Sequence, residues 1–288
     1  MTLSQILITT EFGGGPAFDA VAPLASALEE RGIAARHWCC EESELPDLAS
    51  VDRIVVLGGD GTMMAILRAL EFPAVPLYGV NFGQVGFLMN PQLAAPELAE
   101  VVSRQDVLEQ TFPVLEAALT LESGEVISLR AVNDFVLERA SGQTVHLRTY
   151  IDGVLLNRYS GDGLIVATPG GSTAYSLAAG GPVVHWAVPG MVMTPLYPHR
   201  PVQFHSLQFP ILLPLSSKIR VEADEVQKRG VRFVADGATQ ECGHSVEIHD
   251  SGNRVRILRD ADYGFVDTLV RKIIGKKPNP SEGSNGGI

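Results

Sequence analysis

The chain has 288 residues, of which 45% are hydrophobic and 19% charged, a globular balance that argues against intrinsic disorder. Its formal net charge of -11 argues against nucleic-acid or anionic-membrane partners, so an anionic ligand would need a local site of backbone N–H groups and helix ends. There is no basic leader, no apolar run long enough to span a membrane and no metal-type cysteine spacing, so we expect a cytoplasmic protein that fixes no metal itself.

The first part of the chain alternates short apolar runs with helical patterns. The expected strand, helix, strand, helix and strand lie at residues 6–8, 18–30, 54–57, 62–70 and 77–80. This order predicts βαβα units on a parallel sheet. We therefore expect an α/β domain over residues 1–112.

The turn Gly58-Gly59-Asp60-Gly61 follows a fully apolar strand and precedes an amphipathic helix. It therefore lies at the carboxyl end of a parallel strand, where open α/β sheets bind ligands, and its glycines let phosphates approach the backbone. Two interpretations stay open. Asp60 either caps the helix or accepts and orients the proton of an attacking hydroxyl, as the catalytic aspartate of other kinases does.

Two further polar segments have open interpretations. Residues 79–88, which include Asn81, form a second glycine-spaced loop at a strand end, either a turn or a ligand loop. The pair Asn133-Asp134 stands between two apolar runs. It could hold the two hydroxyls of a ribose or form an Asx-type turn.

After Pro113 the pattern changes to short strands separated by turn residues. Asp152-Gly153 predicts a type I′ hairpin, since both residues tolerate positive φ. We expect a β-rich domain over residues 113–264, a helix over 265–275 that packs back on the first domain, and a mobile tail over 276–288. The expected strands lie at residues 114–121, 126–132, 145–151, 154–159, 164–168, 211–215, 219–223, 231–235, 245–249 and 255–258.

Asp162, within Gly161-Asp162-Gly163, opens an apolar run that ends in a glycine loop at residues 169–171. Ser172 or Thr173 is expected to cap the helix that follows. A glycine loop that leads into a helix N-terminus suits polar or anionic ligand atoms, and Tyr175 could stack on a base. A capped helix with a core tyrosine, and a turn carboxylate at Asp162, remain the alternatives.

Five segments occur in the order seen in NAD kinases. They are residues 58–61, 79–88, 133–134, 161–163 and 168–176. The most specific part runs from Asp162 to Pro169 and into Gly171-Ser172-Thr173-Ala174-Tyr175-Ser176-Leu177. The sequence therefore resembles the NAD kinase family, closely over most of residues 54–185 and weakly elsewhere.

This resemblance implies a two-domain enzyme with an α/β N-terminal domain and a C-terminal, all-β, sandwich-like domain. Such an enzyme transfers the terminal phosphoryl group of ATP to the 2′-hydroxyl of the adenosine ribose of NAD and makes NADP. ATP would enter with a divalent metal, typically Mg²⁺. The assembly would be a homodimer or a homotetramer.

The resemblance also implies roles for single residues, with Asp60 as the catalytic base. The candidates for substrate binding are Gly58, Gly59, Gly61, Asn81, Asn133, Asp134, Asp162, Thr173, Ala174, Tyr175 and Ser176. Four positions depart from the usual family pattern. Asp134 replaces a glutamate, Gly170 replaces a common threonine, and Ser160 and Phe82 replace basic residues.

Two other functions stay open. A lipid kinase of the diacylglycerol or sphingosine type resembles the chain in its Gly-Gly-Asp-Gly turn and two-domain plan, but would not be expected to carry the segment at residues 168–176. A non-catalytic protein that binds NAD and regulates a partner is the second alternative. The presence of Asp60 argues against it.

Overall fold

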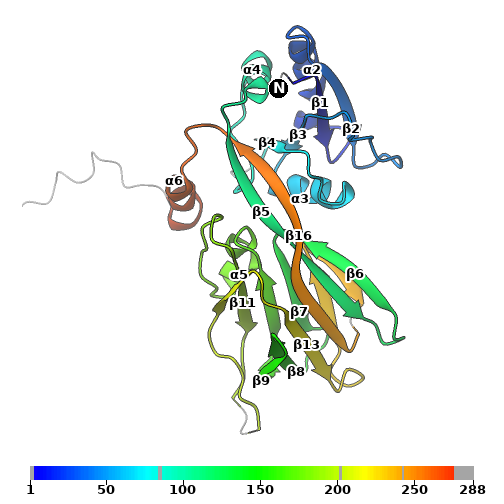
Figure 1. Ribbon diagram of the computed structural model, residues 1–288, viewed down its shortest axis with the longest axis vertical. Coiled ribbons are helices and arrows are strands. Elements are labelled where there is room, and N and C mark those ends of the chain that lie inside the picture. Colours follow the sequence, from blue (N-terminus) through cyan, green and yellow to red (C-terminus); the bar gives the residue numbers. More distant parts are fainter. Residues whose placement is uncertain (1–2, 84–85, 201–202, 242, 276–288) are drawn as a thin grey trace, which may run out of the picture. The chain divides into compact units, whose positions relative to one another are not determined.

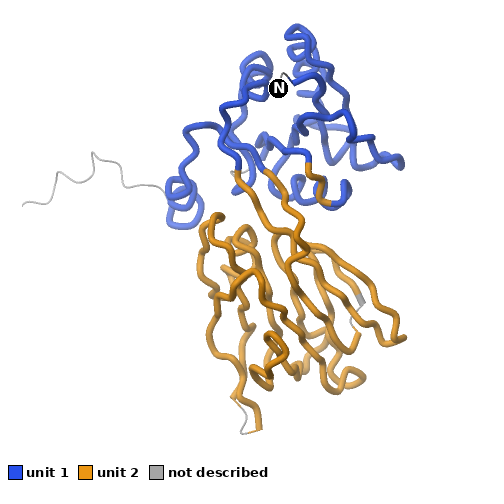
Figure 2. Tube along the Cα trace, in the orientation of Figure 1, with its two compact units in different colours: residues 1–71, 75–109, 257–288 blue, residues 72–74, 110–256 orange. Residues whose placement is uncertain are grey.

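The computed structural model describes residues 3–83, 86–200, 203–241 and 243–275, and the expected mobile tail at 276–288 lies outside this part of the chain. The chain divides into two compact units (Figure 2). The first holds Met1–Glu71, Val75–Glu109 and Ile257–Ile288, and the second holds Phe72–Ala74 and Gln110–Arg256. The second unit is therefore an insertion in the first.

The first unit is an α/β fold around a parallel sheet (Figure 1). Its strands run in the order β2-β1-β3-β4, and the last residues of β16 add to the free side of β4, again in parallel. The elements of this unit are β1 (Gln5–Thr10), α1 (Pro16–Asp19), α2 (Val21–Glu29), β2 (Ala34–Cys39), β3 (Arg53–Gly58), α3 (Asp60–Ala69), β4 (Leu77–Asn81), α4 (Ala95–Ser103), α6 (Phe265–Leu269) and the helical turn η2 (Val270–Ile274).

Burial explains the parallel arrangement. Every residue of β3 is buried, as expected for a strand with both faces covered by helices. Helices α2 and α4 contribute apolar side chains to one core with β1, β3 and β4, while α3 contacts β1 and β3. The expected amphipathic helix is confirmed, since Met63, Ile66 and Leu67 of α3 and Leu70, which follows it, are all buried.

The second unit is made of antiparallel strands that form two layers. One layer has the order β16-β13-β8-β9 with β5 and β6 at its side, and the other has the order β12-β11-β10-β7-β14-β15. The bounds are β5 (Leu108–Thr120), β6 (Val126–Ala131), β7 (Asp134–Arg139), β8 (Val145–Ile151), β9 (Val154–Gly161), β10 (Gly163–Ala167), η1 (Gly171–Thr173), α5 (Tyr175–Ala178), β11 (Gly190–Leu196), β12 (Ile211–Pro214), β13 (Ile219–Asp224), β14 (Val231–Ala235), β15 (Ala238–Glu241) and β16 (Ser245–Arg259).

One apolar core joins the two layers of this unit. It contains Leu147 and Val221 from one sheet and Leu164 from the other, and Phe135 stacks on Phe233 with ring centroids 5.3 Å apart. Shared burial of the inner faces of two antiparallel sheets defines a β-sandwich. The expected fold class, an α/β domain followed by a sandwich-like β domain, is confirmed.

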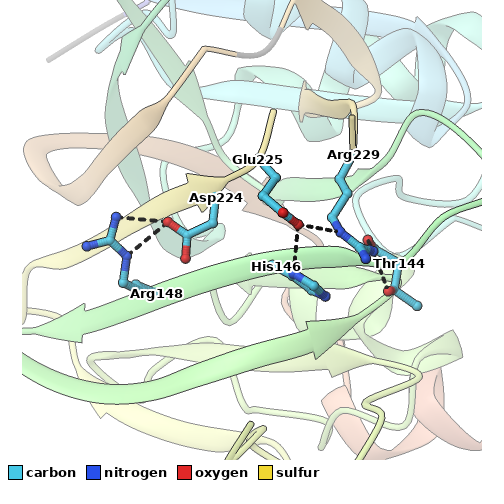
Figure 3. A network of polar contacts seen from close by, with 6 residues as sticks. All are labelled: Thr144, His146, Arg148, Asp224, Glu225 and Arg229. Atoms are coloured by element: carbon cyan, nitrogen blue, oxygen red, sulfur yellow. Dashed lines mark hydrogen bonds and ion pairs between the residues drawn. The ribbon is translucent and has the colours of Figure 1, made fainter. Parts of the chain in front are cut away.

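The hairpin between β8 and β9 forms as predicted. Asp152 and Gly153 have φ values of 50° and 82°, and Ile151 pairs with Val154. A polar network ties the outer face of β8 to the end of β13 and the turn that follows it (Figure 3). Exposed ion pairs contribute little singly, so this network fixes local geometry more than stability. Its members are Thr144, His146, Arg148, Asp224, Glu225 and Arg229.

Several elements differ from the sequence-based expectation. The strand β2 was not predicted because its sequence contains no Val, Ile or Thr and only one strongly strand-favouring residue, Trp38. The strand β11 was not predicted because it contains Pro195, which cannot donate to a sheet ladder. The two strands expected at 245–249 and 255–258 are one continuous strand, β16.

Candidate active site

The Gly-Gly-Asp-Gly turn joins β3 to α3 in the first unit. Gly59 has extended backbone and precedes the helix, and Asp60 is the first helical residue. A Cβ at Gly59 or Gly61 would meet no atom within 4 Å, so the space beside this turn is open. No side chain caps α3, and the interpretation of Asp60 as a helix cap is therefore wrong.

The carboxylate of Asp60 is held by the loop that follows β4. Its Oδ2 accepts a hydrogen bond from the backbone N–H of Phe87 at 2.6 Å, and its Oδ1 accepts one from Leu88 at 3.0 Å. The close approach requires glycine next to them, because a Cβ on Gly86 would lie 1.9 Å from Asp60 Oδ1. Two fixed donors thus set the orientation of this acid before any ligand arrives.

Two cations lie beside this carboxylate. Lys272 of η2 has its Nζ 3.6 Å from Asp60 Oδ2. Arg259, at the end of β16, donates to the carbonyl oxygen of Phe87 and stacks on Tyr263. Burial lowers the pKa of the Arg259 guanidinium, while the charge of Asp60 acts in the opposite sense. The C-terminal segment therefore contributes charged groups to the surroundings of Asp60.

The second glycine loop is a turn that is tied to the first. Asn81 accepts a hydrogen bond from Gly83 N–H at 3.3 Å and donates to the Gly83 carbonyl oxygen at 3.1 Å, as in an Asx-type turn. Phe82 N–H donates to the Gly58 carbonyl oxygen at 2.8 Å. The loop thus supports the Asp60 turn, while Gln84 and Val85 within it lie outside the described residues.

The second unit brings together the other predicted segments. Thr168 N–H donates to the carbonyl oxygen of Asn133 at 2.9 Å, and the Thr168 hydroxyl donates to the Val132 carbonyl oxygen. Gly171 packs so closely that a Cβ on it would lie 2.0 Å from the Asn133 carbonyl oxygen. Asn133-Asp134 and the glycine loop at residues 169–171 are therefore in direct contact, and a shared ligand site there stays a prediction.

An aspartate that the sequence did not single out fixes the backbone of Asn133-Asp134. Asp236 accepts hydrogen bonds from the backbone N–H groups of Val132, Asn133 and Asp134, at 2.8, 2.8 and 3.0 Å. Three N–H donors on one carboxylate favour its ionised form. Asp134 is buried beside it, and the two effects, burial first and the negative charge of Asp236 second, raise the pKa of Asp134 to about 7.

This raised pKa predicts a pH dependence of stability. The folded chain binds a proton at Asp134 more tightly than the unfolded chain, whose Asp pKa is about 3.9. This tighter proton binding stabilises the folded chain. Its contribution to the free energy of unfolding is complete below about pH 4 and is lost as the pH rises to about 7. We expect urea unfolding to show this loss between pH 4 and 7. Asp134→Asn should remove that slope, and an unchanged slope would contradict the assignment.

The segment at residues 171–178 differs in detail from the expectation. It forms the short turn η1 and the single helical turn α5, and neither Ser172 nor Thr173 caps α5, which Ala174 precedes. Ser172 instead donates to the Pro169 carbonyl oxygen at 2.6 Å, and Thr173 donates to that of Gly170 at 3.2 Å. These bonds hold the loop itself and leave Ala174 exposed.

The remaining predicted residues fall into two groups. Tyr175 is 44% exposed and is free to stack on a ligand, so the core interpretation of this tyrosine is wrong. Ser176 is fully buried, with its Oγ 2.9 Å from the Thr194 hydroxyl. Asp162 pairs with Arg139, 3.2 Å between Oδ1 and Nε. The side chains of Ser176 and Asp162 are therefore both bound to protein groups, to Thr194 of β11 and to Arg139 of β7.

Sequence reasoning missed three contributors to these sites. Gly86 lies in the loop at residues 79–88, Asp236 lies in a turn after β14, and Lys272 lies in an expected helix. The only local signal was the Asp236-Gly237 pair, which is typical of a turn and not of a binding site. Among the described residues, no helix is long and apolar enough to cross a membrane.

Comparisons with known proteins agree with this architecture. Residues 34–107 match the ATP-NAD kinase N-terminal domain and residues 132–259 match the ATP-NAD kinase C-terminal domain. The chain is 36% identical to an NAD kinase of Thermomicrobium roseum over 84% of this chain and 83% of that protein.

Two solved structures have the same fold. A yeast NADH kinase complexed with NADH has a TM-score of 0.79 and 25% identity and covers 97% of this chain and 89% of its own. An NAD kinase from Archaeoglobus fulgidus in complex with ATP has a TM-score of 0.70 and 25% identity, with coverage of 89% and 94%. Neither the lipid kinase nor the non-catalytic alternative is supported, and the chain belongs to the NAD kinase family.

Proposed function

We propose that this NAD kinase transfers the terminal phosphoryl group of ATP to the 2′-hydroxyl of the adenosine ribose of NAD, with Asp60 accepting or orienting the proton of that hydroxyl. The observation that carries this proposal is the anchored carboxylate of Asp60 at the carboxyl end of β3, beside open space over Gly59 and Gly61. Phosphoryl transfer depends mainly on positioning and charge stabilisation, which a fixed carboxylate suits.

The second unit supplies the proposed dinucleotide site. Asn133 and Asp134 would bind ribose and nicotinamide groups, and the exposed Tyr175 would stack on a base. Gly58, Gly59, Gly61 and Asn81 would border the phosphates in the first unit. We place Asp162, Thr173, Ala174 and Ser176 in the dinucleotide site as lining or supporting residues.

Gly170, where a threonine is common in the family, packs closely against Phe112. A Cβ at this position would lie 3.0 Å from Cδ1 of Phe112, so that ring would have to shift to admit a threonine. Asp134, one methylene shorter than the usual glutamate, is buried against Asp236. We therefore propose that this chain contacts the ligand here with the Asn133 amide and relies less on the Asp134 carboxylate.

We also propose a homodimer or homotetramer, with Mg²⁺ entering bound to ATP, where it offsets phosphate charge. The support for self-association is the end strand β9, on which Val154, Leu155 and Leu156 are 71%, 47% and 41% exposed. Contiguous exposed apolar residues are typical of protein interfaces. Light scattering on the purified chain would measure the number of subunits in the assembly. The cytoplasmic location stays a prediction from the sequence.

The decisive experiment is a kinase assay with the purified chain, NAD, ATP and Mg²⁺. We expect NADP, detected by a dehydrogenase that accepts NADP and not NAD. Parallel reactions with inorganic polyphosphate and with NADH identify the donor and the preferred acceptor. Tight NAD binding without NADP formation would contradict the proposal and revive a regulatory role.

A further inference from the structure

Lys272 has an environment unlike that of the other residues in its turn. Arg271, Ile273 and Ile274 are exposed, whereas the side chain of Lys272 is only 12% exposed. Its Nζ lies 3.6 Å from Asp60 Oδ2 and 4.4 Å from the centroid of the Phe87 ring. The ammonium group thus contacts both the proposed catalytic carboxylate and the residue whose N–H holds it.

This arrangement is unfavourable for a lysine without a specific partner. Lysine normally keeps its ammonium group in water and buries only its methylene stem. Burial lowers the pKa of Lys272, and the charge of Asp60 is the main opposing effect. An ammonium group held inward, over an aromatic ring and beside a carboxylate, is stabilised chiefly through those two partners.

Anchoring of Asp60 does not require this lysine. Both carboxylate oxygens already accept backbone N–H donors, from Phe87 and Leu88. What Lys272 adds is positive charge, in a protein whose formal net charge is -11. A carboxylate next to an incoming triphosphate is repelled by the phosphate charge, and a cation beside it reduces that repulsion.

We propose that Lys272 is a positioning residue for phosphoryl transfer: its ammonium group, 3.6 Å from Asp60 Oδ2, offsets the repulsion between that carboxylate and the bound nucleotide phosphates. The proposal rests on the proposed role of Asp60. It gives a part in the reaction to the turn η2, which belongs to the first unit.

The test compares Lys272→Met, Lys272→Arg and the matched control Arg271→Met, which removes a cation from the adjacent exposed position. We expect Lys272→Met to lower kcat by about tenfold to a hundredfold with KM for NAD and for ATP within about twofold, because the lost charge acts on the reaction step. Lys272→Arg should restore part of kcat, and Arg271→Met should match the unchanged chain.

Three results would overturn the proposal. They are an unchanged kcat in Lys272→Met, a rise in KM for ATP alone, and equal losses in Lys272→Met and Lys272→Arg at unchanged thermal stability. Should Lys272→Met fail to fold, Lys272→Gln takes its place. Absence of NADP formation by the unchanged chain would instead contradict the proposed function, so the two failures are distinguishable.

Discussion

Asp60→Asn should reduce NADP formation by a factor of roughly 10² to 10⁴, the usual contribution of a positioned general base. The substitution removes the charge and the proton acceptor but keeps the shape of the side chain. NAD should still bind, since the residues proposed to hold the dinucleotide lie in the second unit. Steady-state kinetics give the rate, and calorimetry with NAD alone gives the binding.

The structure also predicts a structural cost for Asp60→Asn. Each carboxylate oxygen accepts one backbone N–H, so an amide leaves either Phe87 or Leu88 facing its NH₂ group. An unpaired donor of this kind costs about 1 to 3 kcal/mol when buried. Thermal unfolding must therefore accompany the kinetics. A variant that stays folded at the assay temperature and turns over normally would exclude Asp60 as the base.

A matched control separates the effect of Asp60→Asn on the reaction from its effect on the hydrogen bonds that hold the side chain. Asp52 lies in the same unit and also accepts two backbone N–H groups, from Ser4 at 2.6 Å and from Gln5 at 2.9 Å. Asp52→Asn makes the same change of charge away from the proposed site. It should affect stability and leave kcat close to that of the unchanged chain.

Gly86→Ala should lower kcat by about a hundredfold or more, because a misplacement of a reacting group by about 1 Å can have that effect. The added methyl group would lie 1.9 Å from Asp60 Oδ1, and the same Cβ would be 2.6 Å from the carboxyl carbon. Either Asp60 or the loop must move. Steady-state kinetics of the folded variant measure the consequence.

Gly83→Ala is the corresponding control. It lies in the same loop, yet a Cβ there would meet no atom within 4 Å. Loss of glycine flexibility is common to both variants, whereas the clash with Asp60 is confined to Gly86→Ala. Equal losses of activity in the two would mean that loop flexibility, and not the placement of the carboxylate, accounts for the effect.

Much of the fold follows from local sequence features. The fully apolar run before Gly58 predicts a strand that is covered on both faces, and the pair Asp152-Gly153 predicts its hairpin from backbone preferences alone. The strands β2 and β11 were not predicted from local sequence features. Their pairing depends on neighbours that are distant in sequence, β2 contains no Val, Ile or Thr, and β11 contains Pro195.

The candidate site was only partly predictable for the same reason. A glycine-rich turn at a strand end indicates where a ligand binds. It does not indicate which distant groups surround the site and change the pKa values of its residues. The partners of Asp134 and Asp60 come from far along the chain: Asp236 is 102 residues beyond Asp134, and Lys272 belongs to the C-terminal turn. Only the fold brings these charges together, so the raised pKa of Asp134 has no signature in the sequence.

The insertion of the second unit into the first has a consequence for biosynthesis. The first unit is closed by the last residues of β16 and by α6 and η2, which leave the ribosome after the whole second unit. The second unit is contiguous apart from Phe72–Ala74, and all of its residues are synthesised before Ile257. The surroundings of Asp60 are then completed last, so a released chain that stops at residue 256 would contain the second unit but would lack Arg259 and Lys272, the two cations beside the proposed catalytic carboxylate.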